Sequence, residues 1–229
     1  MPVVDPSLDL ARIHSEVDEK GFSLLPAYLD DGFCAPVRRF IDDFDTARSE
    51  VNYGGSEKRV WMAHEKDAAI AGFRGFADEL LSRIYGKEII SRDTLAIRNL
   101  PVEQTLELIK GRWHLDSLRT QVKVFAFLTE VTERSGPLEV IPGTHRGGFK
   151  ALHVIDGHLL KLSDFRGNTR KYQKLDDIWV DRIARASGGE KPFICPAGTV
   201  AIVDTSAIHR ARPCLEANRY ALTSYYDHF

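Results

Sequence analysis

The sequence predicts an α+β fold that is mainly β, with helices packed on one side of a β-sandwich or barrel. Amphipathic helical patterns dominate residues 1–92, whereas short β-rich runs dominate residues 93–229. Helices first and short strands afterwards are typical of this arrangement. A chain of 229 residues has the length of one domain with one sizeable core. We therefore expect a single domain over residues 1–229.

Three helices are expected in the first part of the chain. Asp5 followed by Pro6 is typical of a helix start, and Gly21 is typical of the position just after a helix end. Apolar residues at helical spacing predict two further helices, over about residues 33–48 and 67–85.

Residues 50–66, between the second and third helices, have no clear period and are expected to form a loop. Gly54, Gly55 and two aromatic residues leave two interpretations open, a loop that folds over a pocket and a surface loop without a role.

Short runs rich in β-branched and aromatic residues predict the strands. They are Phe22–Pro26, Thr94–Leu100, Thr105–Leu115, Gln121–Leu128, Leu138–Ile141, Pro192–Cys195, Thr199–Val203 and Arg219–Tyr226. The polar segment 143–192 interrupts them as an irregular insert. It is too long for an inert connection, and we expect it to border the mouth of the active site and to influence substrate choice.

Composition excludes several classes of partner. The net charge of −2 gives no reason to expect nucleic acid or an anionic membrane. No basic and apolar leader precedes the first helix, and no apolar run is long enough to span a bilayer. Cys34, Cys195 and Cys214 have no metal-ligand spacing, so we expect buried, reduced thiols and a cytoplasmic location.

The segment Trp113-His114-Leu115-Asp116 carries the first chemical motif. On a strand, side chains two positions apart share a face, so His114 and Asp116 would lie side by side. A second histidine from a distant strand would complete a 2-His-1-carboxylate triad, which suits iron(II) and leaves three coordination positions open. His-x-Asp alone also fits a solvated turn or a surface ion pair.

Further motifs follow in order along the chain. They are the apolar strand Val122–Leu128, the run Ser135-Gly-Pro-Leu with Pro142-Gly-Thr-His145, the strand Ala197–Asp204, His209, and Arg219 ten positions after that histidine. With Asp18–Pro26 near the start, these segments together resemble the phytanoyl-CoA dioxygenase family of iron(II)- and 2-oxoglutarate-dependent oxygenases. The resemblance covers most of the chain.

The resemblance implies a double-stranded β-helix, also called a jelly-roll, and assigns roles to several residues. His114, Asp116 and His209 match the family's metal ligands, and Arg219 matches the arginine that holds the distal carboxylate of 2-oxoglutarate. A guanidinium fork suits that role, because a buried carboxylate without a partner is costly. Phe125 falls where the family tends to place an aromatic residue beside the co-substrate, although core packing explains it equally well.

Two further residues bear on the co-substrate. Thr223 lies four positions after Arg219 on the same strand face and could add a hydroxyl. The family often has a serine two positions after the distal histidine, whereas this chain has Ala211. Related halogenases lack the carboxylate that Asp116 supplies here.

The implied reaction is hydroxylation of an unactivated C–H bond by O2, with 2-oxoglutarate converted to succinate and CO2. The substrate would be a small or medium polar metabolite, because the basic residues are scattered and mark no acyl-CoA site. Alternatives are a cupin-like metal-dependent isomerase or epimerase that does not use 2-oxoglutarate, and a barrel that serves only for binding. His145 is the competing metal ligand, although its motif is more typical of a structural role. The sequence leaves the oligomeric state open.

Overall fold

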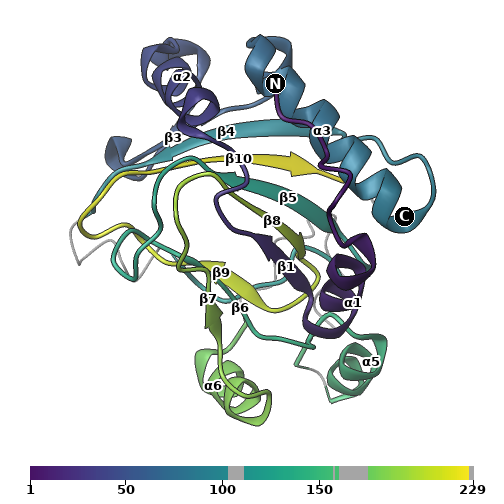
Figure 1. The fold of residues 1–229 in the computed structure, drawn as a ribbon. Helices are drawn as coiled ribbons and strands as arrows, with labels where there is room; N and C mark the ends of the chain where they lie inside the picture. Colours follow the sequence, from purple (N-terminus) through teal and green to yellow (C-terminus); the bar gives the residue numbers. More distant parts are fainter. Residues whose placement is uncertain (103–110, 157, 160–174, 227–229) are drawn as a thin grey trace.

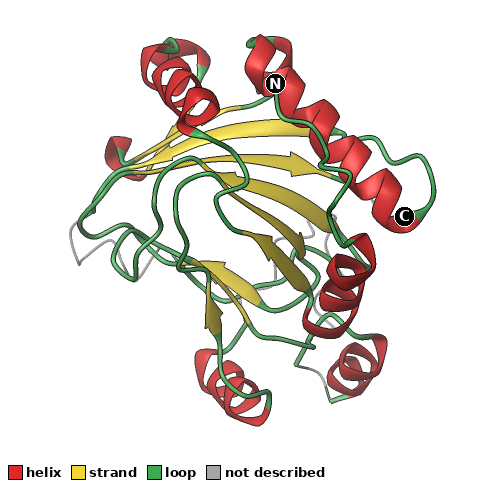
Figure 2. Cartoon of the chain, in the orientation of Figure 1, coloured by secondary structure: helices red, strands yellow, loops and turns green. Residues whose placement is uncertain are grey.

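Two antiparallel sheets face each other in the computed structural model, which describes residues 1–102, 111–156, 158–159 and 175–226 (Figures 1 and 2). The large sheet has seven strands in the order β1–β8–β5–β10–β4–β3–β2, and the short sheet has three in the order β7–β6–β9. Strands distant in the chain are therefore neighbours. This is the double-stranded β-helix, or jelly-roll, and the predicted fold class is confirmed.

The strands have the following bounds. They are β1 (Phe22–Leu25), β2 (Glu50–Asn52), β3 (Glu57–Val60), β4 (Asp93–Asn99), β5 (Val122–Phe127), β6 (Leu138–Val140), β7 (Lys191–Pro192), β8 (Thr199–Asp204), β9 (His209–Ala211) and β10 (Arg219–Tyr225). Most expected strands differ from these by at most one residue at each end. The bounds of short strands depend on single hydrogen bonds to neighbours, which the sequence does not display.

The described α-helices are α1 (Leu10–Lys20), α2 (Asp31–Asp43), α3 (Ala68–Tyr85), α5 (Gly147–Ile155) and α6 (Asp177–Ala186). In Figure 1, α2 and α3 lie over the outer face of the large sheet. Val124 and Leu222 on that face belong to the same buried cluster as Val37 and Phe73 of these helices. The next residues along the strands, such as Ala221, belong to a second cluster between the two sheets. Alternate side chains along β5 and β10 therefore point to opposite faces of the large sheet. One face is covered by the helices, and the other lies between the two sheets.

Aspartate side chains cap the starts of the helices, and the cap of the first helix is Asp9 rather than the expected Asp5. The first helix begins at Leu10, because the Asp9 side chain accepts a hydrogen bond from the Arg12 N–H at 2.9 Å. Asp5 instead closes a turn with the Ser7 N–H at 2.8 Å. Helices α2 and α3 have the same kind of cap, and α2 ends at Asp43, earlier than the predicted residue 48.

The expected loop over residues 50–66 is wrong, because this segment contains β2, β3 and short 3₁₀ turns. Strand β3 pairs with β4 through four register positions, from Glu57 opposite Asn99 to Val60 opposite Ala96. Pairing with an existing sheet edge stabilises strands that have no apolar period of their own. The segment therefore extends the large sheet.

Other differences concern the insert and the His-x-Asp segment. The insert contains α5 and α6, so it is less irregular than expected, and residues 160–174 lie outside the described residues. Of the expected strand Thr105–Leu115, residues 105–110 also lie outside them, and His114 forms a single bridge rather than a strand. The expected strand Pro192–Cys195 is reduced to the two residues of β7 and a bridge at Cys195.

All three cysteines are buried and no disulfide joins them, and burial raises the pKa of the Cys34 thiol to about 11, which keeps it protonated. Among the described residues, no helix combines the length and the apolar character needed to cross a membrane.

Gly198 yields a test of the packing between β8 and the segment that follows β1. Its φ is +79°, and an added Cβ would lie 1.8 Å from the Leu29 carbonyl oxygen. Gly143 has nearly the same φ, +78°, with no atom within 4 Å of such a Cβ. Gly143→Ala should therefore cost about 1–2 kcal/mol of unfolding free energy from backbone strain alone. Gly198→Ala should cost about 1–3 kcal/mol more because of the clash. Urea unfolding measures both, and equal losses would contradict the close approach.

Candidate metal centre

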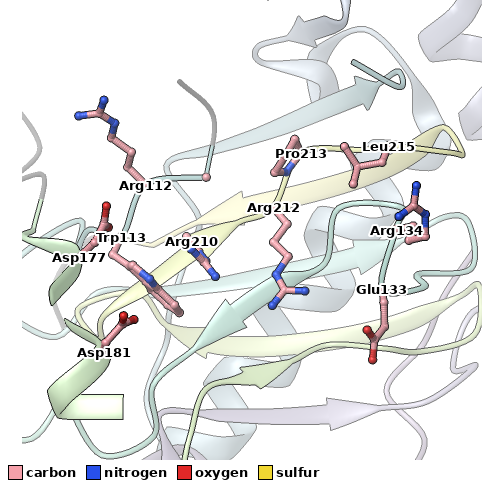
Figure 3. Close-up of a pocket in the computed structure, with 11 residues that line it drawn as sticks. Arg112, Trp113, Glu133, Arg134, Asp177, Asp181, Arg210, Arg212, Pro213 and Leu215 are labelled. Atoms are coloured by element: carbon pink, nitrogen blue, oxygen red, sulfur yellow. The ribbon is translucent and has the colours of Figure 1, made fainter. Parts of the chain in front are cut away.

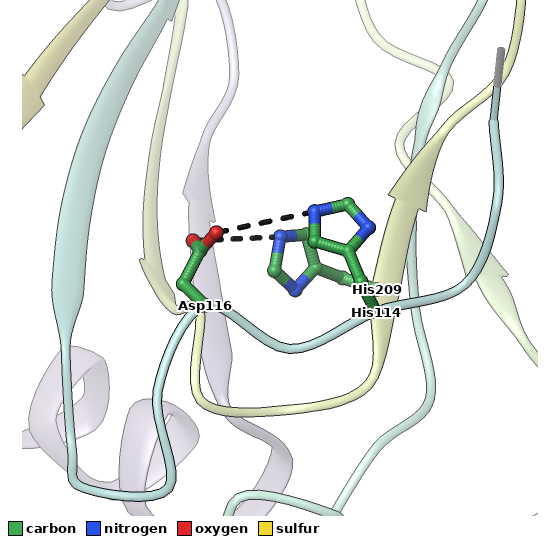
Figure 4. A group of neighbouring side chains, drawn as sticks. All are labelled: His114, Asp116 and His209. Atoms are coloured by element: carbon green, nitrogen blue, oxygen red, sulfur yellow. Dashed lines mark ion pairs between the residues drawn. The ribbon is translucent and has the colours of Figure 1, made fainter. Parts of the chain in front are cut away.

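His114, Asp116 and His209 form a cluster between the sheets, in agreement with the position predicted for them (Figure 4). One ligand atom from each residue can be chosen so that all three lie within 4.8 Å of one another. His114 Nε2 lies 3.9 Å from Asp116 Oδ1, and His209 Nε2 lies 3.6 Å from Asp116 Oδ2. Among the described residues this is the only group of three or more such side chains.

Backbone pairing places the three residues. The His114 N–H donates to the His209 carbonyl at 3.0 Å, and the His209 N–H donates to the His114 carbonyl at 2.8 Å. The Asp116 N–H donates to the Thr205 carbonyl at 3.0 Å. The segment before β5 is thus bonded to the chain around β9, which brings the distant histidine to the His-x-Asp motif.

Both imidazole rings are oriented for metal binding through Nε2. His114 Nδ1 lies 2.9 Å from the Arg112 carbonyl oxygen, and His209 Nδ1 lies 2.9 Å from the Ala207 carbonyl oxygen. A carbonyl can only accept, so each Nδ1 carries the proton and each Nε2 presents a lone pair. Burial, together with the nearby His114, lowers the pKa of His209 to about 4, so this ring is neutral at neutral pH.

Asp116 is ionised although it is largely buried. Burial alone would raise its pKa, but His209, Lys123 and His114 together hold the pKa of this carboxyl well below its usual range. The Lys123 ammonium is the nearest of these groups, 2.7 Å from Asp116 Oδ2. The centre therefore offers one carboxylate and two imidazole Nε2 atoms.

This donor set fits a divalent metal ion of borderline softness. Metal–ligand bonds of about 2 Å put neighbouring ligand atoms about 3 Å apart in an octahedron, so the present separations require only a small contraction. Three ligands on one face leave three positions for other molecules. Nε2 lone pairs held by carbonyl bonds on the opposite ring nitrogens are the usual arrangement around such ions.

His145, the competing ligand, does not belong to this cluster. Its Nε2 donates to the Asp18 carbonyl at 2.9 Å, at the end of α1. The ring also packs against Gly21, where an added Cβ would lie 3.0 Å from His145 Nδ1. His145 therefore joins the turn after β6 to the first helix, which is the structural role its motif suggested. His228 lies outside the described residues.

The residues expected near the co-substrate share the inner face of the large sheet. Thr223 of β10 lies directly opposite Phe125 of β5, and Arg219 lies on the same face of β10, four positions earlier. Thr223 and Arg219 are buried, and Phe125 packs against the cluster between the sheets. The structure thus brings all three to the interior that holds the triad. Their roles toward a co-substrate stay predictions.

Arg219 is held in place by a neutral group. The amide orientation of Asn99 that satisfies both of its neighbours accepts from Arg219 Nη2 at 3.3 Å and donates to Glu57 Oε2 at 3.2 Å. Glu57 is itself paired with Arg59, 2.9 Å away. Arg219 therefore keeps a positive charge inside the fold while its contact to Asn99 limits its rotation.

Sequence reasoning missed Lys123, Asn99 and Glu57. Lys123 could have been found, since it precedes Phe125 by two positions and so shares the inner face with it. Asn99 and Glu57 could not, because they meet Arg219 through the pairing of β3, β4 and β10, which no motif in the sequence displays.

A cavity of about 890 Å³ lies beside Trp113, the residue that precedes the His-x-Asp motif (Figure 3). Trp113, Arg210 and Arg212 line it, and none of the triad residues does. The Arg210 guanidinium lies 4.2 Å from the centre of the Trp113 ring, and both arginines pair with the fully buried Glu139 at 2.6 Å. These residues alternate with the histidines along the same segments, so the cavity opens away from the triad.

The described part of the insert packs on the side of the His-x-Asp segment that faces this cavity. Trp179 and Val180 of α6 share a buried cluster with Trp113 and Leu115. The insert therefore packs behind the His-x-Asp motif, and its expected influence on substrate choice stays a prediction.

The fold and the site together define a class, jelly-roll proteins with a candidate 2-His-1-carboxylate centre. The model of the family described as "Phytanoyl-CoA dioxygenase (PhyH)" matches residues 105–217, which include His114, Asp116 and His209. The chain belongs to this family of iron- and 2-oxoglutarate-dependent enzymes, and the resemblance noted in the motifs is confirmed. Arg219 lies just beyond the matched span.

Solved structures with the same fold differ widely from this chain in sequence. The non-heme alpha ketoglutarate dependent carbocyclase SnoK from nogalamycin biosynthesis has a TM-score of 0.70 at 16% identity, over 99% of this chain and 86% of that one. The structure of EctD from S. alaskensis with bound Fe has a TM-score of 0.69 at 16% identity, over 99% and 83%. The epimerase SnoN in complex with Fe3+, alpha ketoglutarate and nogalamycin RO has a TM-score of 0.67 at 14% identity, over 98% and 85%.

At these identities the likeness establishes the fold alone. The groups expected from the sequence, iron and 2-oxoglutarate, are both bound in the SnoN structure, and iron is bound in the EctD structure. No curated protein matches the chain at a significant level.

Replacement of His209 tests the centre. His209→Ala should weaken binding of Fe(II) or Co(II) by at least about 100-fold, since even loss of a ligand's hydrogen-bond partner typically costs 10–100-fold. Anaerobic equilibrium dialysis measures the change. His145→Ala is the control, because it should keep the metal affinity and lose only about 1 kcal/mol of stability with its bond to Asp18. Loss of metal through His145→Ala, with His209→Ala unaffected, would reverse the assignment.

Proposed function

We propose that the chain is an iron(II)- and 2-oxoglutarate-dependent dioxygenase that hydroxylates an unactivated C–H bond of a small metabolite or biosynthetic intermediate, releasing succinate and CO2. The observation that carries this proposal is the convergence of His114, Asp116 and His209 in an interior whose face also holds the buried Arg219. Membership of the family supports the cofactor, the co-substrate and the use of O2.

The three triad residues would hold the iron from one side. His114 and His209 bind through Nε2, since their Nδ1 protons are engaged with carbonyl oxygens. Asp116 contributes a negative charge that partly neutralises the ion. When bound, iron with 2-oxoglutarate and O2 supplies the oxidising chemistry, and the protein supplies position and exclusion of water.

Arg219 would bind the distal carboxylate of 2-oxoglutarate. Its guanidinium is buried and contacts the neutral Asn99 amide rather than a carboxylate among the described residues. A planar fork can hold an incoming carboxylate through two parallel hydrogen bonds. The hydroxyl of Thr223 and the ring of Phe125 lie along the same inner face and would line the path of the co-substrate.

Hydroxylation is the outcome we propose among those available to such a centre. Asp116 occupies the position that related halogenases leave without a carboxylate. The names of the structural neighbours include an epimerase and a carbocyclase, so the fold itself accommodates other outcomes. Reaction under ¹⁸O₂ separates them, because hydroxylation adds one labelled oxygen atom to the product. Epimerisation leaves the product mass unchanged, and desaturation or ring formation removes two hydrogens.

The charge of the chain supports the substrate class that we propose. A net charge of −2 with scattered basic residues favours a small polar molecule over a nucleic acid or an acyl-CoA. Anaerobic titration of the Fe(II) protein with 2-oxoglutarate, followed by a screen for compounds that raise succinate formation, would identify it. The cytoplasmic location and the single domain over residues 1–229 stay predictions.

Arg219→Ala tests the co-substrate site. Loss of one partner of a buried charge pair typically costs about 3–5 kcal/mol. The variant should therefore bind 2-oxoglutarate about two to four powers of ten more weakly, at about 1.4 kcal/mol per tenfold. Iron binding should survive, because the three ligands are unchanged. Arg219→Lys should recover only part of the loss, because an ammonium lacks the fork.

A matched control is Arg98→Ala. Arg98 lies on the helix-facing side of the neighbouring strand β4 and pairs with Asp42 at 2.8 Å. Its loss should leave 2-oxoglutarate binding unchanged. Normal co-substrate affinity in Arg219→Ala would make that arginine structural and would favour a metal-dependent isomerase that does not use 2-oxoglutarate.

A further inference from the structure

Lys123 is a charged residue in the apolar strand β5, and neither the motifs nor the proposed chemistry accounts for it. Its neighbour Val124 packs in the core beneath the helices, so Lys123 faces the interior between the sheets. The side chain is 12% exposed, and its Nζ lies 2.7 Å from Asp116 Oδ2. The same ammonium lies 4.6 Å from the centre of the Tyr225 ring.

The position of Lys123 becomes electrostatically unfavourable when a metal ion binds at Asp116. A buried ammonium must be paired, and a metal ion bound by Asp116 would add two further positive charges close to it. An apolar residue at this position would avoid that repulsion. The close contact to one oxygen of Asp116 is therefore the feature to explain.

The two oxygens of Asp116 have different surroundings. Oδ2 forms an ion pair with Lys123 and lies 3.6 Å from His209 Nε2, whereas Oδ1 lies 3.9 Å from His114 Nε2 and has no contact with Lys123. A carboxylate can bind a metal ion through one oxygen or through both. If both bound, the second would occupy one of the three positions that a facial triad leaves open for co-substrate and oxygen.

We propose that Lys123 is a positioning residue that restricts Asp116 to binding the metal through a single oxygen. With Oδ2 in an ion pair with the ammonium, Oδ1 would be the oxygen free to bind the ion, and the third open position would stay available. This inference rests on the proposed function, because it assigns Lys123 a role at that same centre. Lys123 also lowers the affinity for the bare metal ion by charge repulsion while it favours the dianionic co-substrate.

Replacement of Lys123 should therefore change metal and co-substrate binding in opposite directions. We would titrate the wild type and Lys123→Met with Co(II), and then titrate the Co(II)-loaded proteins with 2-oxoglutarate without oxygen. In Lys123→Met, Co(II) should bind as tightly as in the wild type or up to about tenfold more tightly, because a like charge is removed. The dissociation constant of 2-oxoglutarate should rise at least about tenfold.

The visible absorption of Co(II) supplies a readout independent of turnover. A second oxygen from Asp116 would replace a solvent ligand at one of the open positions and so change the ligand field. The Co(II) spectrum of Lys123→Met should therefore differ from that of the wild type before any 2-oxoglutarate is added. Lys123→Arg keeps the charge and the donors, and should restore most of the wild-type spectrum and co-substrate affinity.

Lys58→Met is the matched control for the loss of a buried lysine. The Lys58 ammonium donates to the Asp42 carbonyl at 3.0 Å and to the Phe44 carbonyl, at the end of α2 and away from the triad. This variant should unfold at a lower temperature while keeping the wild-type Co(II) spectrum and both affinities.

Three results would overturn the inference. Parallel weakening of Co(II) and 2-oxoglutarate binding with a lower unfolding temperature would make Lys123 a folding residue. Unchanged binding would make its contact with Asp116 incidental. Weaker 2-oxoglutarate binding with an unchanged Co(II) spectrum would mean that Lys123 contacts the co-substrate directly. Failure of the wild type to bind Co(II) or 2-oxoglutarate would instead count against the proposed function.

Discussion

Two backbone hydrogen bonds between His114 and His209 hold the candidate centre together. They form a single antiparallel bridge, and the Asp116 N–H adds a third bond to the Thr205 carbonyl. Because the main chain makes these bonds, the separation of the two imidazoles depends on strand pairing and not on side-chain contacts. The centre therefore requires the facing arrangement of the two sheets, and the helices matter to it by stabilising the large sheet from outside.

The alternation of side chains gives β5 and β10 two separate tasks. Val124 and Leu222 pack beneath the helices, while Lys123 and Arg219 carry charge into the space between the sheets. Buried charges are tolerated only with partners, and here the partners are Asp116 for the lysine and the Asn99 amide for the arginine. Residues that pack beneath the helices and residues that serve the site can therefore change independently, although they lie on the same strands.

Periodicity along the chain was sufficient for the α+β, mainly β class, because periodicity is a local property. The jelly-roll and the triad of His114, Asp116 and His209 were predicted from the resemblance of the motifs to the family, as was the role proposed for Arg219. The sequence was insufficient where a residue's surroundings come from strand pairing, as for Glu57 and Asn99, which meet through β3 and β4. Residues 50–66 were misjudged for the same reason, since their strands depend on an edge supplied by another part of the chain.

Trp113, described above for its contact with Arg210, has a consequence for how the centre can be observed. Trp113 directly precedes His114 in the chain, and its indole packs against the Arg210 guanidinium, which lies 4.2 Å from the ring centre. A fluorophore so close to a ligand, with so little freedom to rotate, would have its emission quenched by a paramagnetic ion bound at the triad. The protein thus contains its own optical probe of occupancy, on the side of the segment that faces away from the chemistry.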